Sequence, residues 1–131
     1  MKQFEPLSNH FDLEVLRVLW ETEESLTKSE IVDRSTFIKY NSAGLHIQRL
    51  LEKGIIQIAD FKQTKTSYAR AYTPVLSYEE YIASLINRPQ KTPKLKLGNL
   101  LSALCDDVEI SEETLAELEG VIKKYREDKK E

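Results

Sequence analysis

The residues best suited to metal binding or nucleophilic chemistry are scattered through this 131-residue sequence. His10, His46 and Cys105 lie far apart and share no ligand motif, whereas a zinc site needs such groups at short, fixed spacings. No serine lies in a nucleophile motif, and the four glycines are too widely spaced for a phosphate-binding loop. The sequence therefore predicts no catalytic site, no metal centre and no cofactor, and it indicates that the protein is not an enzyme.

The polar residues that do share a pattern lie in residues 41–54, NSAGLHIQRLLEKG, which predict an amphipathic helix. One face is expected to carry Ala43, Ile47, Leu50 and Leu51, and the opposite side Ser42, Leu45, His46 and Arg49. Asn41 or Ser42 is expected to cap the start of the helix, and Gly54 its end. A helix of this kind fits the major groove of DNA, where its N-terminal residues reach base edges. We therefore expect residues 42–53 to form a recognition helix.

Three side chains of this region have alternatives to DNA contact. His46 could be solvated rather than donate to a base or a phosphate. Arg49 could pair with Glu52 or Glu30 instead of binding a guanine edge or a phosphate. Tyr40, just before the helix, could stack in the core instead of donating to a phosphate. The sequence leaves these alternatives open.

Two helices and a turn are expected to precede the recognition helix. Ser8 is the expected N-cap of a first helix over about Asn9–Glu23, whose apolar residues recur at helical spacing. The segment Thr27–Glu30, T-K-S-E, is a capping box that predicts the start of a short second helix. Residues 36–40 are expected to form a turn with Phe37 and Ile38 directed inward.

A β-hairpin is expected after Gly54, because residues 55–61 and 67–73 are both strand candidates. The polar linker between them gives the hairpin a basic tip. Its expected phosphate contacts, which position a protein without reading sequence, are Lys62, Lys65 and Arg70. Helix, short helix, helix and hairpin in this order predict a mainly α fold with a small β-hairpin, the winged helix-turn-helix.

A fourth helix and a separate helical unit are expected after the hairpin. A second capping box, S-Y-E-E at Ser77–Glu80, starts the fourth helix, which ends before Pro89. The predicted organisation is a winged-helix DNA-binding domain over residues 1–87, a linker over 88–94 and a helical dimerisation domain over 95–131. Its two helices cannot bury both apolar faces alone, so a second copy of the chain is the expected cover. The predicted dimer contacts are Leu97, Leu100, Leu101, Leu104, Leu115, Leu118, Ile122 and Tyr125.

Charge is distributed unevenly along the chain. The net charge is −3, but the segment 28–75 contains eight basic and four acidic residues. The segment 106–119 contains acidic residues and no basic ones. This pattern is typical of a DNA-contacting module joined to one that does not contact DNA. The single cysteine indicates a reducing, cytoplasmic setting. No segment has the pattern of a signal peptide or a membrane span, so no membrane partner is expected.

Several segments, in this order and spacing, resemble the penicillinase-repressor family of small bacterial regulators. They are LEVLRVLWE (13–21), TKSEIVDR (27–34), SAGLHIQRLLEKGII (42–56), RAYTPVLSYEEY (70–81), LGNLLSAL (97–104) and ISEETLAELEGVIK (110–123). The resemblance implies a homodimeric repressor that binds a palindromic operator in double-stranded DNA. By position, the residues facing DNA would be Lys28, Tyr40, Asn41, Ser42, Leu45, His46 and Arg49, with Lys62, Lys65 and Arg70 in the wing.

Two family features are missing from this sequence. The antibiotic-responsive members are cleaved at an Asn–Phe bond, whereas the matching place here is Ala103–Leu104. The copper-responsive members end in paired Cys-x-Cys motifs, which this sequence lacks. An inducing protease or sensor therefore stays unknown. The alternative function is a protein–protein interaction adaptor on the same winged-helix fold, without sequence-specific DNA binding.

Overall fold

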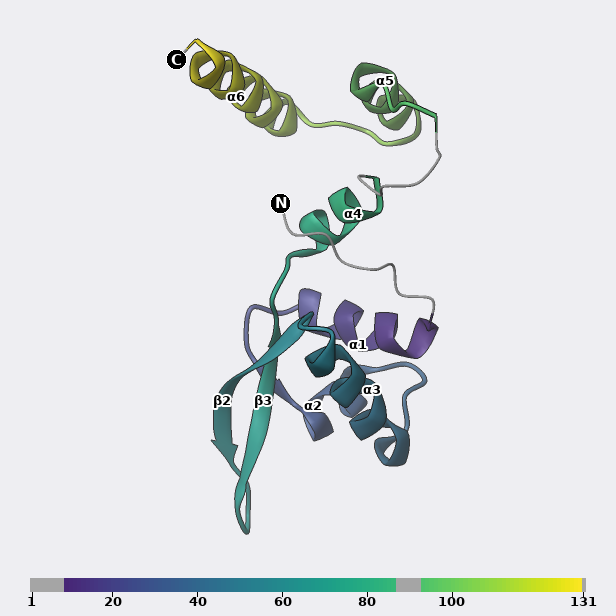
Figure 1. The fold of residues 1–131 in the computed structure, drawn as a ribbon, viewed down its shortest axis with the longest axis vertical. Coiled ribbons are helices and arrows are strands. Elements are labelled where there is room, and N and C mark those ends of the chain that lie inside the picture. The colour runs from purple at the N-terminus through teal and green to yellow at the C-terminus, as the bar shows by residue number, and fades with distance from the viewer. Residues whose placement is uncertain (1–8, 87–92, 131) are drawn as a thin grey trace. The chain divides into compact units, whose positions relative to one another are not determined.

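The computed structural model describes residues 9–86 and 93–130. The chain divides into two compact units, residues 1–90 and 91–131. The first contains α1 (His10–Trp20), β1 (Leu26–Thr27), α2 (Lys28–Arg34), α3 (Tyr40–Glu52), β2 (Ile56–Gln63), β3 (Tyr68–Pro74) and α4 (Tyr78–Ile86), and the second contains α5 (Leu97–Asp107) and α6 (Glu112–Lys129) (Figure 1). Most of the predicted linker, residues 88–94, lies outside the described residues.

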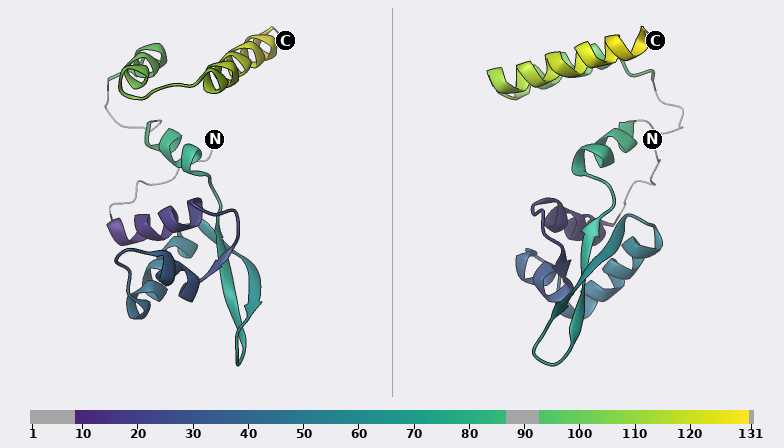
Figure 2. Two further views of the ribbon diagram at one scale, coloured as in Figure 1. Left: turned by 180° about the vertical axis from the view of Figure 1, so that it is seen from behind. Right: turned by 90° about the vertical axis from the view of Figure 1, so that its left-hand side faces the viewer.

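The first unit has the predicted winged helix-turn-helix fold, in which α1, α2 and α3 pack beside a small antiparallel sheet (Figure 2). The strand order is β1-β3-β2. The long β2–β3 hairpin projects from the helices as the wing, and its pairing is irregular between Ile58 and Asp60. The hairpin is confirmed. The sequence prediction missed β1, which pairs Leu26 with Tyr72, because a two-residue strand has no detectable periodicity.

Helix α1 is shorter than predicted. It begins at His10 and ends at Trp20, rather than extending from Asn9 to Glu23. Its N-cap is Asn9, whose side-chain oxygen accepts a hydrogen bond of 2.9 Å from the Phe11 N–H. Asparagine is among the strongest N-cap residues, so the assignment of this role to Ser8, which lies outside the described residues, is corrected.

Both capping boxes are confirmed. At the start of α2, the Thr27 hydroxyl accepts from the Glu30 N–H at 3.3 Å, and the Glu30 carboxylate accepts from the Thr27 N–H at 3.0 Å. At the start of α4, Ser77 and Glu80 make the same reciprocal pair at 3.0 and 2.9 Å. Each box satisfies two backbone N–H groups that a helix start would otherwise leave unpaired.

The loop before α3 differs from its prediction in one side chain. Ile38 is buried as expected, but Phe37 is 44% exposed and is not a core residue. The Ser35 hydroxyl accepts hydrogen bonds from the N–H groups of Phe37 and Ile38, at 3.2 and 2.9 Å. The Phe37 ring then lies beside His10 and Phe11, with 5.4 Å between ring centroids in both cases.

The sequence predicted the end of α3 correctly but not its N-cap. The N-cap is Lys39, which makes no side-chain cap hydrogen bond, so the expectation that Asn41 or Ser42 caps this helix is wrong. The helix starts at Tyr40. The glycine stop is confirmed, because Gly54 has φ +72°, a conformation that glycine adopts without strain.

The backbone after α3 closes as a Schellman motif. The N–H groups of Gly54 and Ile55 donate to the carbonyl oxygens of Leu51 and Leu50, both at 3.0 Å. Ile55 is buried, so the chain leaves the helix directly into the core and enters β2. This turn fixes the direction of the wing relative to α3.

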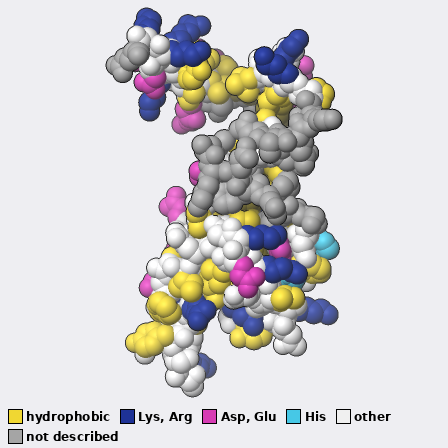
Figure 3. Space-filling view, in the orientation of Figure 1, with side chains coloured by type: hydrophobic (Ala, Val, Ile, Leu, Met, Phe, Trp, Pro, Cys, Tyr) yellow, Lys and Arg dark blue, Asp and Glu magenta, His cyan; other side chains and the backbone are white. Residues whose placement is uncertain are grey.

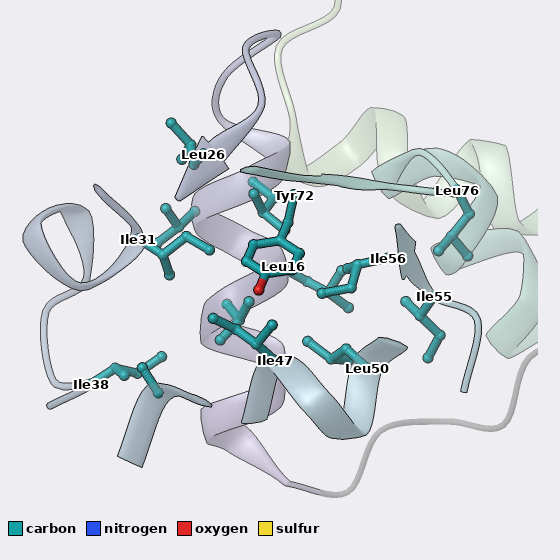
Figure 4. Packing of buried hydrophobic residues seen from close by; sticks show 14 of the residues in the cluster. Leu16, Leu26, Ile31, Ile38, Ile47, Leu50, Ile55, Ile56, Tyr72 and Leu76 are labelled. Carbon is teal, nitrogen blue, oxygen red and sulfur yellow. The ribbon is translucent and has the colours of Figure 1, made fainter. Parts of the chain in front are cut away.

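The core of the first unit holds α3 against α1, α2 and the sheet (Figure 4). Its members come from the first three helices, the sheet, the segments that connect them and α4: Val15, Leu16, Val18, Leu19, Leu26, Ile31, Ile38, Ala43, Ile47, Leu50, Ile55, Ile56, Tyr72, Leu76 and Tyr81. Full burial of a Leu or Ile side chain stabilises the folded state by roughly 1.5–3 kcal/mol relative to leaving it exposed. The core therefore fixes which face of α3 is left to solvent.

Candidate nucleic-acid interface

The outward face of α3 is a stripe of exposed residues spaced four, three and four apart. Its members are Asn41, Leu45, Gln48 and Glu52. Side chains at this spacing line one side of a helix. Asn41 and Leu45 were predicted here, and Ser42 is half-buried beside them. Gln48 was missed, although its distance of three residues from Leu45 was a sufficient signal. Its amide donates to the Glu52 carboxylate at 3.2 Å.

Lys28 and Tyr40 lie together at the start of α3. The Lys28 Nζ is 4.1 Å from the centroid of the Tyr40 ring, which is a cation–π contact. A Cβ placed on Gly44 would lie 3.4 Å from the same Nζ, so the lysine crosses the first turns of α3. The N-terminus of a helix carries a partial positive charge, and Lys28 adds a full one. This end of α3 is therefore suited to a phosphate group.

His46 does not lie on the outward face, and the prediction that it does is wrong. Its side chain is buried, with 5% of the residue exposed, and its ring stacks on Phe11 with 5.0 Å between centroids. The spacing of His46 from Ala43 and Leu50 places it on the core side of α3. Its Nδ1 lies 3.1 Å from the buried Asp12 carboxylate. His46 therefore packs α3 against α1.

Arg49 lies at the border between the core side and the outward face. Its side chain is 35% exposed, and its Nη2 is 3.3 Å from the Asp12 carboxylate and 2.7 Å from His46 Nδ1. Neither of the alternative partners considered from the sequence, Glu52 and Glu30, is its partner. The carboxylate that holds Arg49 belongs to α1 instead.

The three wing residues differ in their availability. The ammonium of Lys62 donates to the Ser25 carbonyl at 2.6 Å and to the Glu30 carboxylate at 3.0 Å. It therefore attaches β2 to the start of α2 rather than extending from a free tip, which corrects its expected role. Lys65, in the turn, and Arg70, on β3, are exposed.

The exposed side of the wing is more apolar than the sequence suggested. Phe61 is 59% exposed and Tyr68 is 68% exposed. Phe61 pairs with Arg70 and Gln63 pairs with Tyr68, and directly paired residues of antiparallel strands share a face. Hydrophobic side chains accordingly gather over the hairpin in Figure 3. Arg70 thus shares this face of the wing with Phe61 and Tyr68.

Glu14 of α1 holds the loop that leads into α3. Its carboxylate accepts from the Ser35 hydroxyl at 2.9 Å and from the Thr36 N–H and hydroxyl at 2.9 and 3.1 Å. Arg17 donates to both of its oxygens, at 2.6 and 3.0 Å. The Arg17 hydrogen bonds, aided by those from Thr36 and Ser35 and opposed by burial, lower the pKa of Glu14 from its usual 4.5 to about 2. This group was not singled out from the sequence.

The eight predicted dimer contacts all lie on α5 and α6. Six of them are exposed (Leu97, Leu101, Leu104, Leu115, Ile122 and Tyr125), and Leu100 and Leu118 are half-buried. Neither α5 nor α6 contributes a buried residue. Ser111 caps the start of α6, since its hydroxyl accepts from the Thr114 N–H at 3.1 Å. The apolar seam of the second unit is therefore open to solvent in a single chain.

The described residues were also compared with the requirements of a metal site and of a membrane span. Among residues 9–86 and 93–130, no group of three or more His, Cys, Asp or Glu side chains is placed to hold a metal ion. Cys105 is an exposed free cysteine. None of the helices in these two ranges combines the length and the apolar character that crossing a membrane requires.

Comparison with known proteins gives one sequence-family match and several structural likenesses. The penicillinase repressor family profile matches residues 10–124. No curated protein matches the chain. The match covers both units of the protein, including α1 and most of α6.

Three solved structures illustrate the likeness of fold. A PadR-family transcription regulator from Clostridium difficile R20291 is 19% identical, with a TM-score of 0.43, over 60% of this chain and 82% of that one. PadR from Bacillus subtilis in complex with operator DNA is 17% identical, with a TM-score of 0.47, over 92% and 73%. MarR from Staphylococcus aureus, in complex with salicylate and kanamycin, is 20% identical, with a TM-score of 0.44, over 92% and 72%.

Proposed function

The chain belongs to the penicillinase repressor family, and on that premise we propose that it is a homodimeric repressor of transcription that binds a palindromic operator. Membership of this family makes it a winged-helix transcriptional regulator. The observation that carries the proposal is the stripe along α3, which faces solvent while Ala43, Ile47 and Leu50 of the same helix are buried in the core. In the proposed complex, α3 lies in the major groove of the operator and the wing lies along the DNA phosphates.

The proposed base contacts lie on the stripe. Asn41 and Gln48 carry amides, whose paired donor and acceptor match the edge of adenine. Leu45 is the apolar group between them, suited to the methyl group of thymine. To contact a base, Gln48 must give up its hydrogen bond to Glu52. This bond is exposed to solvent, so breaking it costs little free energy.

The proposed phosphate contacts flank the stripe. Lys28 and the Tyr40 hydroxyl lie at the N-terminus of α3, with Ser42 beside them. Arg49 lies at the border of the stripe, and Lys65 and Arg70 lie on the wing. Lys62 and His46 serve instead to hold the wing and α3 in place.

The second unit supplies the proposed dimer. A seam of eight apolar side chains on α5 and α6 has no cover within its own unit. A second copy that presents the same seam covers it symmetrically, as in most two-fold dimers. Two copies of α3 would then read half-sites about one helical turn of DNA apart, or a multiple of that distance.

The salt dependence of DNA affinity tests this function, and a variant of the wing is compared with the unaltered protein. We expect the logarithm of the binding constant for duplex DNA, measured by fluorescence anisotropy, to fall linearly with the logarithm of the salt concentration. The reason is that Lys and Arg contacts to phosphates release counterions. Lys65→Ala is expected to weaken binding to all duplexes similarly and to reduce the slope by about one.

Lys124→Ala, the same charge change on an exposed lysine of α6, is the matched control and should leave the slope unchanged. Binding that does not respond to salt, or no binding to any duplex, contradicts the proposed function.

The adaptor function remains the second candidate, because one observation favours it. The aromatic rings of Phe61 and Tyr68 are largely exposed on the wing, and such groups are enriched in protein–protein interfaces. An adaptor would keep its partner when DNA is absent, and it would show no salt-dependent affinity for duplexes. The titration above therefore separates the two functions.

A further inference from the structure

Asp12 is a buried carboxylate whose partners both come from α3. Only 1% of the residue is exposed. Its Oδ1 lies 3.1 Å from His46 Nδ1 and 3.3 Å from Arg49 Nη2. An ionised carboxylate without a partner is very unfavourable in a protein interior. Arg49 of α3 is therefore the side chain that donates to this buried carboxylate of α1.

The hydrogen-bonding roles in this cluster follow from the chemistry of arginine. A guanidinium can only donate, so at 2.7 Å from Arg49 Nη2 the His46 Nδ1 is the acceptor. With Nδ1 accepting from Arg49, His46 does not donate from this nitrogen to the Asp12 carboxylate 3.1 Å away. Arg49 Nη2 lies within reach of two acceptors, the imidazole nitrogen and the carboxylate. One guanidinium nitrogen is thus fixed from two sides.

The Arg49 side chain is partly buried and partly accessible to solvent. Nε of Arg49 is buried and has no hydrogen-bond partner among the described residues. About a third of the side chain is nevertheless accessible, and it lies at the border of the exposed stripe of α3. The buried anchor restricts the rotamers of a long side chain, which reduces the entropy that a contact with a ligand would cost.

We propose that Asp12 is a positioning residue for Arg49, holding its guanidinium at the edge of α3 so that the free end meets a DNA phosphate. The proposal rests on the proposed function, because it assumes that α3 approaches DNA. His46 is part of the same device, since its Nδ1 is the second acceptor for Nη2. Neither Asp12 nor His46 touches the DNA.

A double-mutant cycle on the full-length protein tests this role. Affinity for duplex DNA is measured against salt concentration for the unaltered protein, Asp12→Asn, Arg49→Ala and the double variant. We expect Arg49→Ala to weaken binding about tenfold and to reduce the salt slope by about one. Asp12→Asn keeps an acceptor oxygen but removes the negative charge that strengthens the bond from the guanidinium, so it is expected to reproduce part of both effects. The double variant should be no weaker than Arg49→Ala.

A second substitution covers the case in which Asp12→Asn fails to fold. Asparagine at position 46 places an acceptor oxygen near the position of Nδ1, so His46→Asn should retain the affinity and the salt slope. His46→Leu, which keeps the bulk and removes the acceptor, should lose them. Circular dichroism at the temperature of the titration establishes that each variant is folded.

The outcomes of this cycle are distinct from failure of the function itself. If the unaltered protein binds no duplex, the proposed function is wrong. If it binds, but the effects of Asp12→Asn and Arg49→Ala add, or His46→Leu leaves the slope intact, then Asp12 supports only the fold and the positioning role is overturned.

Discussion

Ile122→Glu in α6 is expected to weaken operator binding by about 100- to 10,000-fold, the largest effect of any single substitution considered. Ile122 lies in the middle of the open seam of α6. In the proposed dimer a glutamate at this position would be buried without a partner, so the two copies would separate. Each monomer would then hold a single half-site and would lose the gain in affinity from linked binding.

Ala116→Glu is the matched control, because it adds the same charge to another part of the surface of α6. It should leave both the mass in analytical ultracentrifugation and the affinity for the operator unchanged. A dimer that survives Ile122→Glu, or a monomer that binds the operator as tightly as before, would show that α6 does not join the two copies.

Glu14→Gln is expected to lower the free energy of unfolding at neutral pH by up to roughly 3 kcal/mol. The carboxylate is buried, and its pKa is lowered from 4.5 to about 2 by Arg17 and by the Ser35 and Thr36 groups that it accepts from. Each unit of such a shift corresponds to about 1.4 kcal/mol. Loss of this carboxylate removes the attachment of α1 to the loop before α3.

The pH dependence of this effect has a definite sign. The carboxyl pKa is lower in the folded state than in the unfolded state, so the stabilisation is complete above about pH 4.5 and declines as the pH falls toward 2. Urea unfolding of the two proteins across this range should therefore converge at low pH. Glu23→Gln, an exposed carboxylate of the same unit, should change stability by no more than about 0.5 kcal/mol. A Glu14→Gln difference that is independent of pH would contradict this account.

The features that the sequence predicted well are those set by neighbouring residues. The capping boxes at Thr27 and Ser77 each need only four residues, and both form as expected. Gly54 was predictable for the same reason, because the left-handed backbone conformation that often ends a helix strongly favours glycine. Such local rules were enough to establish the order of helices and hairpin, and from it the fold class.

The site was less predictable because distant residues decide it. His46 was expected on the outward face, but Asp12 and Phe11, more than thirty residues earlier in the chain, hold it in the core. Lys62 was expected at a free tip, but Ser25 and Glu30 bind its ammonium. A polar residue can be placed on either face of a helix when its partner comes from another element.

Part of this error could have been avoided from periodicity alone. Position 46 lies three residues after Ala43 and four before Leu50, which is the spacing of the buried face. The spacing of Asn41, Leu45 and Gln48 similarly defines the outward stripe. By contrast, nothing in the sequence identified Glu14 as the group that holds the loop before α3, because its partners Ser35 and Thr36 are separated from it by a helix and a strand.

Selection of bound duplexes from a random pool reports DNA binding, symmetry and half-site spacing in one experiment. A dimeric repressor should enrich an inverted repeat whose half-sites lie about one helical turn apart, or a multiple of that distance. A pool that shows no enrichment, or an enriched sequence without two-fold symmetry, would contradict a dimeric repressor that reads its operator through α3.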